Sequence, residues 1–184
     1  ADTRLIIRSL NETLLGASCS RRRLLLQEGR GCFCGHPQKC LRLLQEEWYL
    51  TAVVRAFQSF GVVDPKAVFN LENAKAAGIP ADIYMFPCRS RSPQIQVDSL
   101  IRAIPNGLYN RVWINIESNP SQGCSWNGLG AAPNCQYITQ LAQTLIARGK
   151  KIGIKTSKRI WESITDSCRS VSTHPLWYAN YDNK

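Results

Sequence analysis

One acidic residue stands out among the side chains that could take part in catalysis. Glu117 follows a run of β-forming residues, and tyrosine and tryptophan recur near the ends of the neighbouring predicted strands. Aromatic faces bind sugar rings, and a partly desolvated carboxyl group can protonate a leaving oxygen. This combination indicates carbohydrate cleavage. Glycosidases usually need two carboxyl groups, however, and from spacing alone a Glu just past a strand is more often a solvated loop residue.

These side chains must be positioned by the elements predicted after Lys39, where the hydrophobic periodicity becomes regular. Short runs of β-forming residues predict strands at 49–57, 82–86, 111–116, 151–155 and 176–178. Helices are predicted at 40–47, 64–78, 92–104, 137–147 and after Ser157, most of them with start or stop signals such as Pro65 and Gly78. The alternation predicts parallel strands joined by crossover helices, as in a doubly wound sheet or a (β/α) barrel.

In parallel α/β folds, reacting groups gather at the carboxyl ends of the strands. The residues at these ends are Arg55, Gln58, Tyr84, Phe86, Asn115, Glu117, Lys155, Trp177 and Tyr178. The two-residue period of a strand places Trp113, Asn115 and Glu117 on one face. No glycine-rich phosphate loop follows a predicted strand, so we expect no nucleotide and no other cofactor.

The charge of the chain favours anionic partners. The net charge is +10, and residues 1–45 carry eight Lys or Arg against three Asp or Glu. A solvated basic face is the simpler interpretation, but such a field also attracts bacterial wall polymers. Aromatic residues are not interleaved with the basic ones, which disfavours nucleic-acid binding. No apolar run reaches the roughly 18 residues that span a bilayer.

The hydrophobic period divides the chain into two parts, and the cysteine content indicates the compartment of the protein. Residues 1–39 are a basic, cysteine-rich segment without a clear period, and residues 40–184 form the regular domain. Eight cysteines permit four disulfides, and a glycosylation sequon begins at Asn11, so we expect an extracellular or a lysosomal or phagosomal location. One cluster of potential zinc ligands lacks a standard spacing, so we expect no metal there: Cys32, Cys34, His36 and Cys40.

Four motifs carry a family resemblance. They are Tyr84–Cys88, Val112–Glu117, Gly153–Ser157 with Trp161, and Pro175–Asp182. In this order they resemble the motifs of glycoside hydrolase family 25 lysozymes, especially the branch of protists and invertebrates, over residues 40–184. The resemblance implies an irregular (β/α) barrel that cleaves the β-1,4 bond after N-acetylmuramic acid in bacterial peptidoglycan.

The resemblance also implies roles for individual residues. Glu117 matches the general acid of the family, and Asn115 stands where the family has an Asp that assists the reaction. Cys124 and Cys135 match cysteines of the same branch, which implies a disulfide between them across the loop after Glu117. We expect substrate contacts from strand-end side chains, namely Arg55, Tyr84, Phe86, Trp177 and Tyr178.

Several positions depart from the family pattern. Asn115 cannot carry negative charge beside a developing oxocarbenium ion, which costs rate. Lys155 replaces a tyrosine, and residues 1–39 contain no Gly-x-Asp-x-Ser strand. The family pattern continues for two more strands and an Asp beyond Lys184. We therefore expect an incomplete or irregular barrel, either as a fragment or as a divergent copy that closes in another way.

Three functions are compatible with these features. The first is a monomeric muramidase, active or weakly active, that acts on peptidoglycan. The second is a pseudoenzyme that binds wall glycan through Tyr84, Trp177 and Tyr178. The third is a cationic antimicrobial protein whose N-terminal segment acts on anionic envelopes without hydrolysis.

Overall fold

The computed structural model describes residues 8–10 and 51–179. Several predictions lie outside these residues: the helix at 40–47, nearly all of the basic segment 1–39, and the cysteines and histidine of the candidate zinc cluster. The cationic antimicrobial function, which depended on residues 1–45, is likewise not tested by the described part of the chain.

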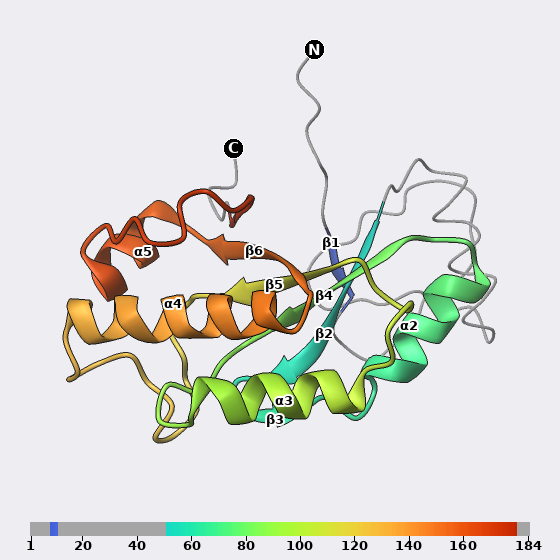
Figure 1. The fold of residues 1–184 in the computed structure, drawn as a ribbon, viewed down its shortest axis with the longest axis horizontal. Helices are drawn as coiled ribbons and strands as arrows, with labels where there is room; N and C mark the ends of the chain where they lie inside the picture. Colours follow the sequence, from blue (N-terminus) through green and yellow to red (C-terminus); the bar gives the residue numbers. More distant parts are fainter. Residues whose placement is uncertain (1–7, 11–50, 180–184) are drawn as a thin grey trace, which may run out of the picture.

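In the part of the chain that the structure describes, seven strands form one sheet (Figure 1). They are β1 (Arg8–Leu10), β2 (Ala52–Gln58), β3 (Val62–Val63), β4 (Ala81–Met85), β5 (Arg111–Asn115), β6 (Lys151–Thr156) and β7 (Leu176–Tyr178). The order is β1-β2-β4-β5-β6-β7, with every neighbouring pair parallel, and β3 pairs antiparallel with β2. The predicted parallel neighbours are thus confirmed. In the described residues the path is open and does not close into a barrel, as expected for an incomplete one.

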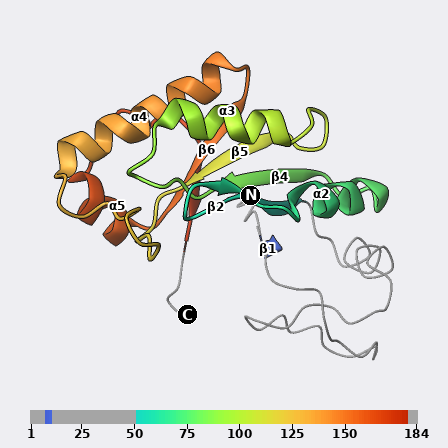
Figure 2. The same cartoon turned by 90° about the horizontal axis from the view of Figure 1, so that it is seen from below.

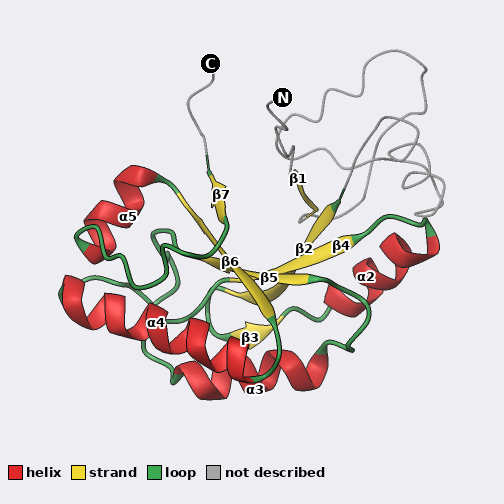
Figure 3. Ribbon diagram, turned by 45° about the horizontal axis from the view of Figure 1, so that its top comes forward, coloured by secondary structure: helices red, strands yellow, loops and turns green. Residues whose placement is uncertain are grey.

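Within residues 51–179, four helices connect the strands: α2 (Ala67–Ala76), α3 (Pro93–Ala103), α4 (Ala131–Ala147) and α5 (Lys158–Thr165). Figures 2 and 3 show α3 and α4 lying along one face of the sheet. Alternate strand residues such as Val54, Ile83 and Ile114 face the helices and join one buried cluster with Leu100 and Leu141. Burying this apolar surface stabilises the fold by roughly 25 cal/mol per Å². The side chains that alternate with them along each strand point to the opposite face of the sheet.

Two helices begin at other residues than the sequence predicts. α2 begins at Ala67 rather than Pro65, because Asp64 accepts a hydrogen bond from the backbone of Lys66 (2.9 Å) and closes a turn before the helix. α4 begins at Ala131, six residues before Tyr137. Polar residues in its first turns interrupt the apolar period that marked the rest of the helix.

The predicted disulfide between Cys124 and Cys135 is wrong. Cys124 pairs with Cys88 after β4 (Cα–Cα 4.4 Å), and Cys135 pairs with Cys168 after α5 (5.9 Å). Both cysteines are therefore in disulfides, but each bridge joins different βα units. The loop after β5 folds back onto the end of β4, while Cys135 lies on α4 beside α5. The resemblance located the cysteines, and the chain's path decides their partners.

The described residues contain neither a membrane-spanning helix nor a candidate metal-binding group. None of their helices is long and apolar enough to cross a membrane. They contain no group of three or more His, Cys, Asp or Glu side chains that could hold a metal ion.

Candidate active site

The strand registers align the candidate residues in rows across the sheet. Arg55 is opposite Tyr84, and Tyr84 is opposite Trp113. One step towards the carboxyl edge, Asn115 is opposite Lys155, and Lys155 is opposite Trp177. These residues alternate with those that face the helices, so they share the opposite face of the sheet.

Glu117 lies two residues beyond Asn115 and is the centre of a polar group. Its Oε1 atom is 2.8 Å from Nζ of Lys155, and its Oε2 atom accepts a hydrogen bond from Nδ2 of Asn115 (3.3 Å). Nζ of Lys155 also donates to Oδ1 of Asn115 (3.1 Å). The side chains of Lys155 and Glu117 are only 13% and 21% exposed, and Asn115 is buried. The three side chains thus contact one another in a partly desolvated network.

The amide of Asn115 suits this network better than a carboxylate would. It accepts from the ammonium with its oxygen and donates to Glu117 with its nitrogen. An ionised Asp at this position could accept from Lys155 but would place a second negative charge beside Glu117. The amide at residue 115 is therefore matched to the lysine at residue 155.

Aromatic rings surround the ammonium. Nζ of Lys155 is 5.1 Å from the ring centroid of Trp177 and 5.9 Å from that of Tyr84, within the range of cation–π attraction. Trp177 meets Tyr84 edge to face, with centroids 6.5 Å apart, and meets Trp113 in the same way at 5.9 Å. The rings provide apolar surface next to Glu117, as a sugar-binding site requires.

Trp113 is held in place from below. Its Nε1 atom donates to Oδ2 of Asp82 (2.9 Å), whose Oδ1 accepts from the backbone of Arg111 (3.1 Å). Burial raises the pKa of Asp82 above its ordinary value, although Trp113 and Arg111 favour the ionised form. A Cβ atom at Gly153 would collide with the indole, so a glycine is required beneath it.

The backbone of Glu117 is fixed by the loop that follows it. Nε1 of Trp126 donates to the carbonyl of Glu117 (2.9 Å). Asn119 donates to the carbonyls of Ser59 (2.8 Å) and Pro87 (3.1 Å), which anchors the loop to the ends of β2 and β4.

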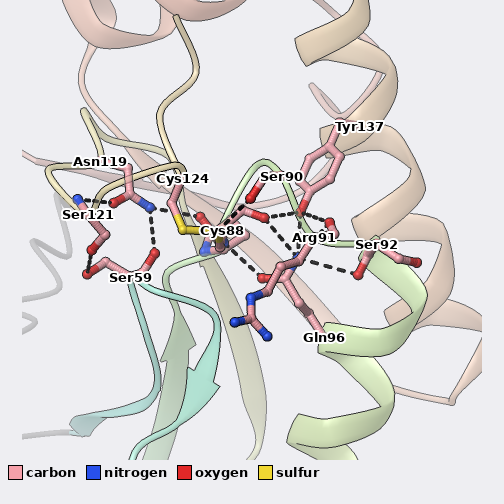
Figure 4. Close-up of a disulfide and its surroundings, with 11 residues drawn as sticks. Ser59, Cys88, Ser90, Arg91, Ser92, Gln96, Asn119, Ser121, Cys124 and Tyr137 are labelled. Carbon is pink, nitrogen blue, oxygen red and sulfur yellow. Dashed lines mark hydrogen bonds between the residues drawn. A yellow bond between two sulfur atoms is a disulfide. The ribbon is translucent and has the colours of Figure 1, made fainter.

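The disulfide between Cys88 and Cys124 fastens the same loop, and Figure 4 shows it between Asn119 on one side and Gln96 and Tyr137 on the other. Gln96 accepts from the backbone N–H of Cys88 (2.8 Å), and Tyr137 donates to the carbonyl of Cys88 (2.8 Å). Burial raises the pKa of Tyr137 to about 12, so this donor stays neutral.

The structure brings together some of the predicted site residues and not others. Asn115, Glu117, Tyr84 and Trp177 are gathered, either by direct contacts or through Lys155. Arg55 is in register with Tyr84 and forms a 2.7 Å ion pair with Asp64.

The two remaining predicted contacts are placed differently. Phe86 is half-buried, and its backbone N–H donates to Phe57 after β4. Tyr178 is 51% exposed and lies on the face of β7 opposite to Trp177, because neighbouring strand residues alternate. Its position does not place it beside Trp177, and its contact with substrate stays a prediction.

Three residues of the site were not among the predicted site residues. The two-residue period already placed Trp113 on the face of Asn115 and Glu117, and the same period places Asp82 on the face of Tyr84. Lys155 was identified as a strand-end residue and as a departure from the family, but its contact with Glu117 depends on the pairing of β5 with β6.

Comparison with known proteins identifies the fold and the family. The family model described as Lysozyme-like protein 1 matches residues 36–184. The chain is 35% identical to Probable GH family 25 lysozyme 2 of Dictyostelium discoideum over 143 residues, covering 76% of this chain and 65% of that protein. It is 33% identical to Probable GH family 25 lysozyme 5 of the same organism, covering 80% of this chain and 69% of that protein.

Solved structures show the same fold at low sequence identity. The muramidase from Acremonium alcalophilum has a TM-score of 0.70 at 17% identity, covering 78% of this chain and 72% of the other. The bacterial lysozyme from Streptomyces coelicolor has a TM-score of 0.67 at 23% identity, covering 76% and 67%. The chain spans 65% and 61% of the lengths of lysozymes 2 and 4 of Dictyostelium discoideum. By its family model and these relatives, the chain belongs to the lysozyme-like proteins of glycoside hydrolase family 25.

Proposed function

We propose that this chain is a lysozyme-like glycoside hydrolase that acts on bacterial peptidoglycan, with Glu117 as its general acid and with slow turnover. The observation that carries the proposal is the gathering of Glu117, Asn115 and three aromatic rings on the face opposite to α3 and α4, at the carboxyl edge of the sheet. Two disulfides within the described residues support an oxidising compartment, such as the cell exterior or a lysosome.

Each part of the site has a task in glycosidic cleavage. Tyr84 and Trp177 offer ring faces and edges against which a sugar can bind. Glu117 delivers a proton to the oxygen of the leaving sugar, as the acid of a glycosidase pair does. Asn115 holds the carboxyl group in position and can hydrogen-bond to substrate, but it supplies no negative charge for the oxocarbenium-like transition state.

The ion pair with Lys155 explains why turnover should be slow. An ammonium at 2.8 Å stabilises the ionised form of a carboxyl group, whereas a general acid must carry its proton when the substrate arrives. Protonating Glu117 requires the loss of this pairing inside a partly desolvated site, where electrostatic interactions are stronger than in water. The same observation favours a second candidate function, which is glycan binding without hydrolysis.

One experiment separates the two functions. The full chain with its disulfides intact is incubated with purified, insoluble peptidoglycan, and both the bound protein fraction and the clearing of the suspension are measured. Hydrolysis predicts slow clearing that is lost in Glu117→Gln, with binding retained. Binding without clearing supports the second function. The absence of both binding and clearing would overturn the proposal.

A further inference from the structure

Lys155 has a binding capacity that the proposed catalytic step does not use. Its ammonium has three N–H donors, of which one meets Oε1 of Glu117 and one meets Oδ1 of Asn115. Among the described residues no further oxygen accepts a hydrogen bond from Nζ. The third donor is therefore available to a ligand on the glycan-binding face.

The ammonium is also held in position. It lies between the rings of Trp177 and Tyr84, at 5.1 and 5.9 Å from their centroids, with 13% of the side chain exposed. A long side chain that is already ordered loses little freedom when a ligand binds, and partial desolvation strengthens its attraction for an anion. An exposed lysine is a flexible and strongly hydrated cation, whereas Lys155 is ordered and partly desolvated. The arrangement therefore favours an anionic ligand.

The carboxylates on this face already have donors of their own. Asp82 is engaged by Trp113 and Arg111, and Glu117 is engaged by Lys155 and Asn115. A ligand carboxylate that reaches Nζ of Lys155 would complete a carboxylate–ammonium–carboxylate bridge. Such a bridge keeps the existing ion pair and adds a charge-assisted hydrogen bond, which is about twice as strong as a neutral one.

We infer that Lys155 makes the site selective for glycans that carry a free carboxylate, namely N-acetylmuramic acid residues whose lactyl group is no longer joined to a peptide stem. The inference rests on the proposed action on peptidoglycan and names its preferred substrate class. Free lactyl carboxylates arise when water cleaves the amide bond to the stem, so a stem-removing amidase reaction must supply this substrate.

The test compares two oligosaccharides that differ only in charge. The probes are a tetrasaccharide of alternating N-acetylglucosamine and N-acetylmuramic acid with free lactyl carboxylates, and the same tetrasaccharide with these carboxylates converted to primary amides. Dissociation constants are measured by calorimetry for the full chain, Lys155→Met and Lys155→Arg. Lys151→Met is the matched control, because Lys151 begins the same strand and is exposed.

We expect the unmodified chain to bind the carboxylate form about tenfold more tightly, and higher salt to reduce this preference. Lys155→Met should bind both probes alike, whereas Lys155→Arg and Lys151→Met should keep the preference. Equal affinity of the unmodified chain for both probes, or an unchanged preference in Lys155→Met, overturns the inference but leaves glycan binding intact. Binding of neither probe overturns the inference and the proposed function together.

Discussion

Lys155 of β6 and Glu117, which follows β5 and is separated from Lys155 by 38 residues in the sequence, form a 2.8 Å ion pair on the face of the sheet opposite to α3 and α4. Asn115 bridges the two by accepting from the ammonium and donating to the carboxylate. The proposed general acid is thus paired with a cation. Most of the predictions below follow from this network.

Removing the ammonium should speed the cleavage of intact peptidoglycan. In Lys155→Tyr, Glu117 loses the ammonium that stabilises its ionised carboxylate. We expect the rate of wall clearing to rise about tenfold, a modest share of what a general acid contributes. Lys151→Met, at the exposed start of the same strand, should leave the rate unchanged. A rate for Lys155→Tyr no higher than that of the unmodified chain would contradict the inhibitory role of Lys155.

Asn115→Asp should have opposing effects on stability and rate. The new carboxylate is buried beside Glu117, and the two share one ammonium, so we expect the free energy of unfolding to fall by about 1–3 kcal/mol. Repulsion between the two carboxylates also favours the protonation of one of them, so we expect a small increase in cleavage. Chemical denaturation and reducing-sugar release measure the two effects. Unchanged stability would show that the amide is not needed in the network.

Asp82 should make stability depend on pH. Burial raises its pKa above the ordinary 3.8, so just above pH 3.8 the folded chain holds more protons at this residue than the unfolded chain. The contribution of Asp82 to the free energy of unfolding therefore decreases as the pH rises through its raised pKa. Asp82→Asn should remove this decrease in urea titrations between pH 4 and 7. The exposed Asp98, whose pKa is lowered by Gln94 and Arg148, provides the control Asp98→Asn, which should not remove it.

Gly153→Ala should disturb the aromatic part of the site. The added methyl group collides with the indole of Trp113, which is 4% exposed and cannot move outward. We expect a loss of about 1–3 kcal/mol in stability and weaker glycan binding, because Trp177 meets the displaced ring. Near-ultraviolet circular dichroism should report the change in the tryptophan environment. Unchanged spectra and binding would show that Trp113 does not support the platform.

The disulfides can be checked by peptide mapping without reduction. The expected bridges are Cys88–Cys124 and Cys135–Cys168, which close loops of 36 and 33 residues. Replacing both Cys88 and Cys124 with Ser should cost about 3–4 kcal/mol by the loop-entropy estimate, and it should loosen the loop that follows Glu117. A peptide that joins Cys124 to Cys135 would contradict the structure.

The sequence predicts the strands well because their signal is local. The runs at 82–86, 111–116 and 151–155 agree with β4, β5 and β6 to within one residue at either end. The sequence does not predict the start of α4, because its first turns lack the apolar period of the rest of the helix. One of the polar residues there, Asn134, uses its side chain to donate hydrogen bonds to the carbonyls of Trp126 and Ile164.

Long-range contacts could not be predicted in the same way. Glu117 and Tyr84 were identified from strand ends and motifs, both of which are local features of the sequence. The partner of Cys124 and the contact of Lys155 with Glu117 depend on how separate βα units pack and on the register of paired strands. A single sequence does not directly specify the packing of the βα units or the register of the paired strands.

The most direct test of the central claim measures new reducing ends on N-acetylmuramic acid. Purified peptidoglycan is incubated with the full, disulfide-intact chain or with Glu117→Gln, and the released saccharides are reduced with borohydride and analysed by mass spectrometry. We predict slow release of fragments that end in reduced N-acetylmuramic acid by the unmodified chain, and none above background by Glu117→Gln. Equal release by the two proteins would remove Glu117 from the mechanism, and release by neither would show that the chain is not a hydrolase.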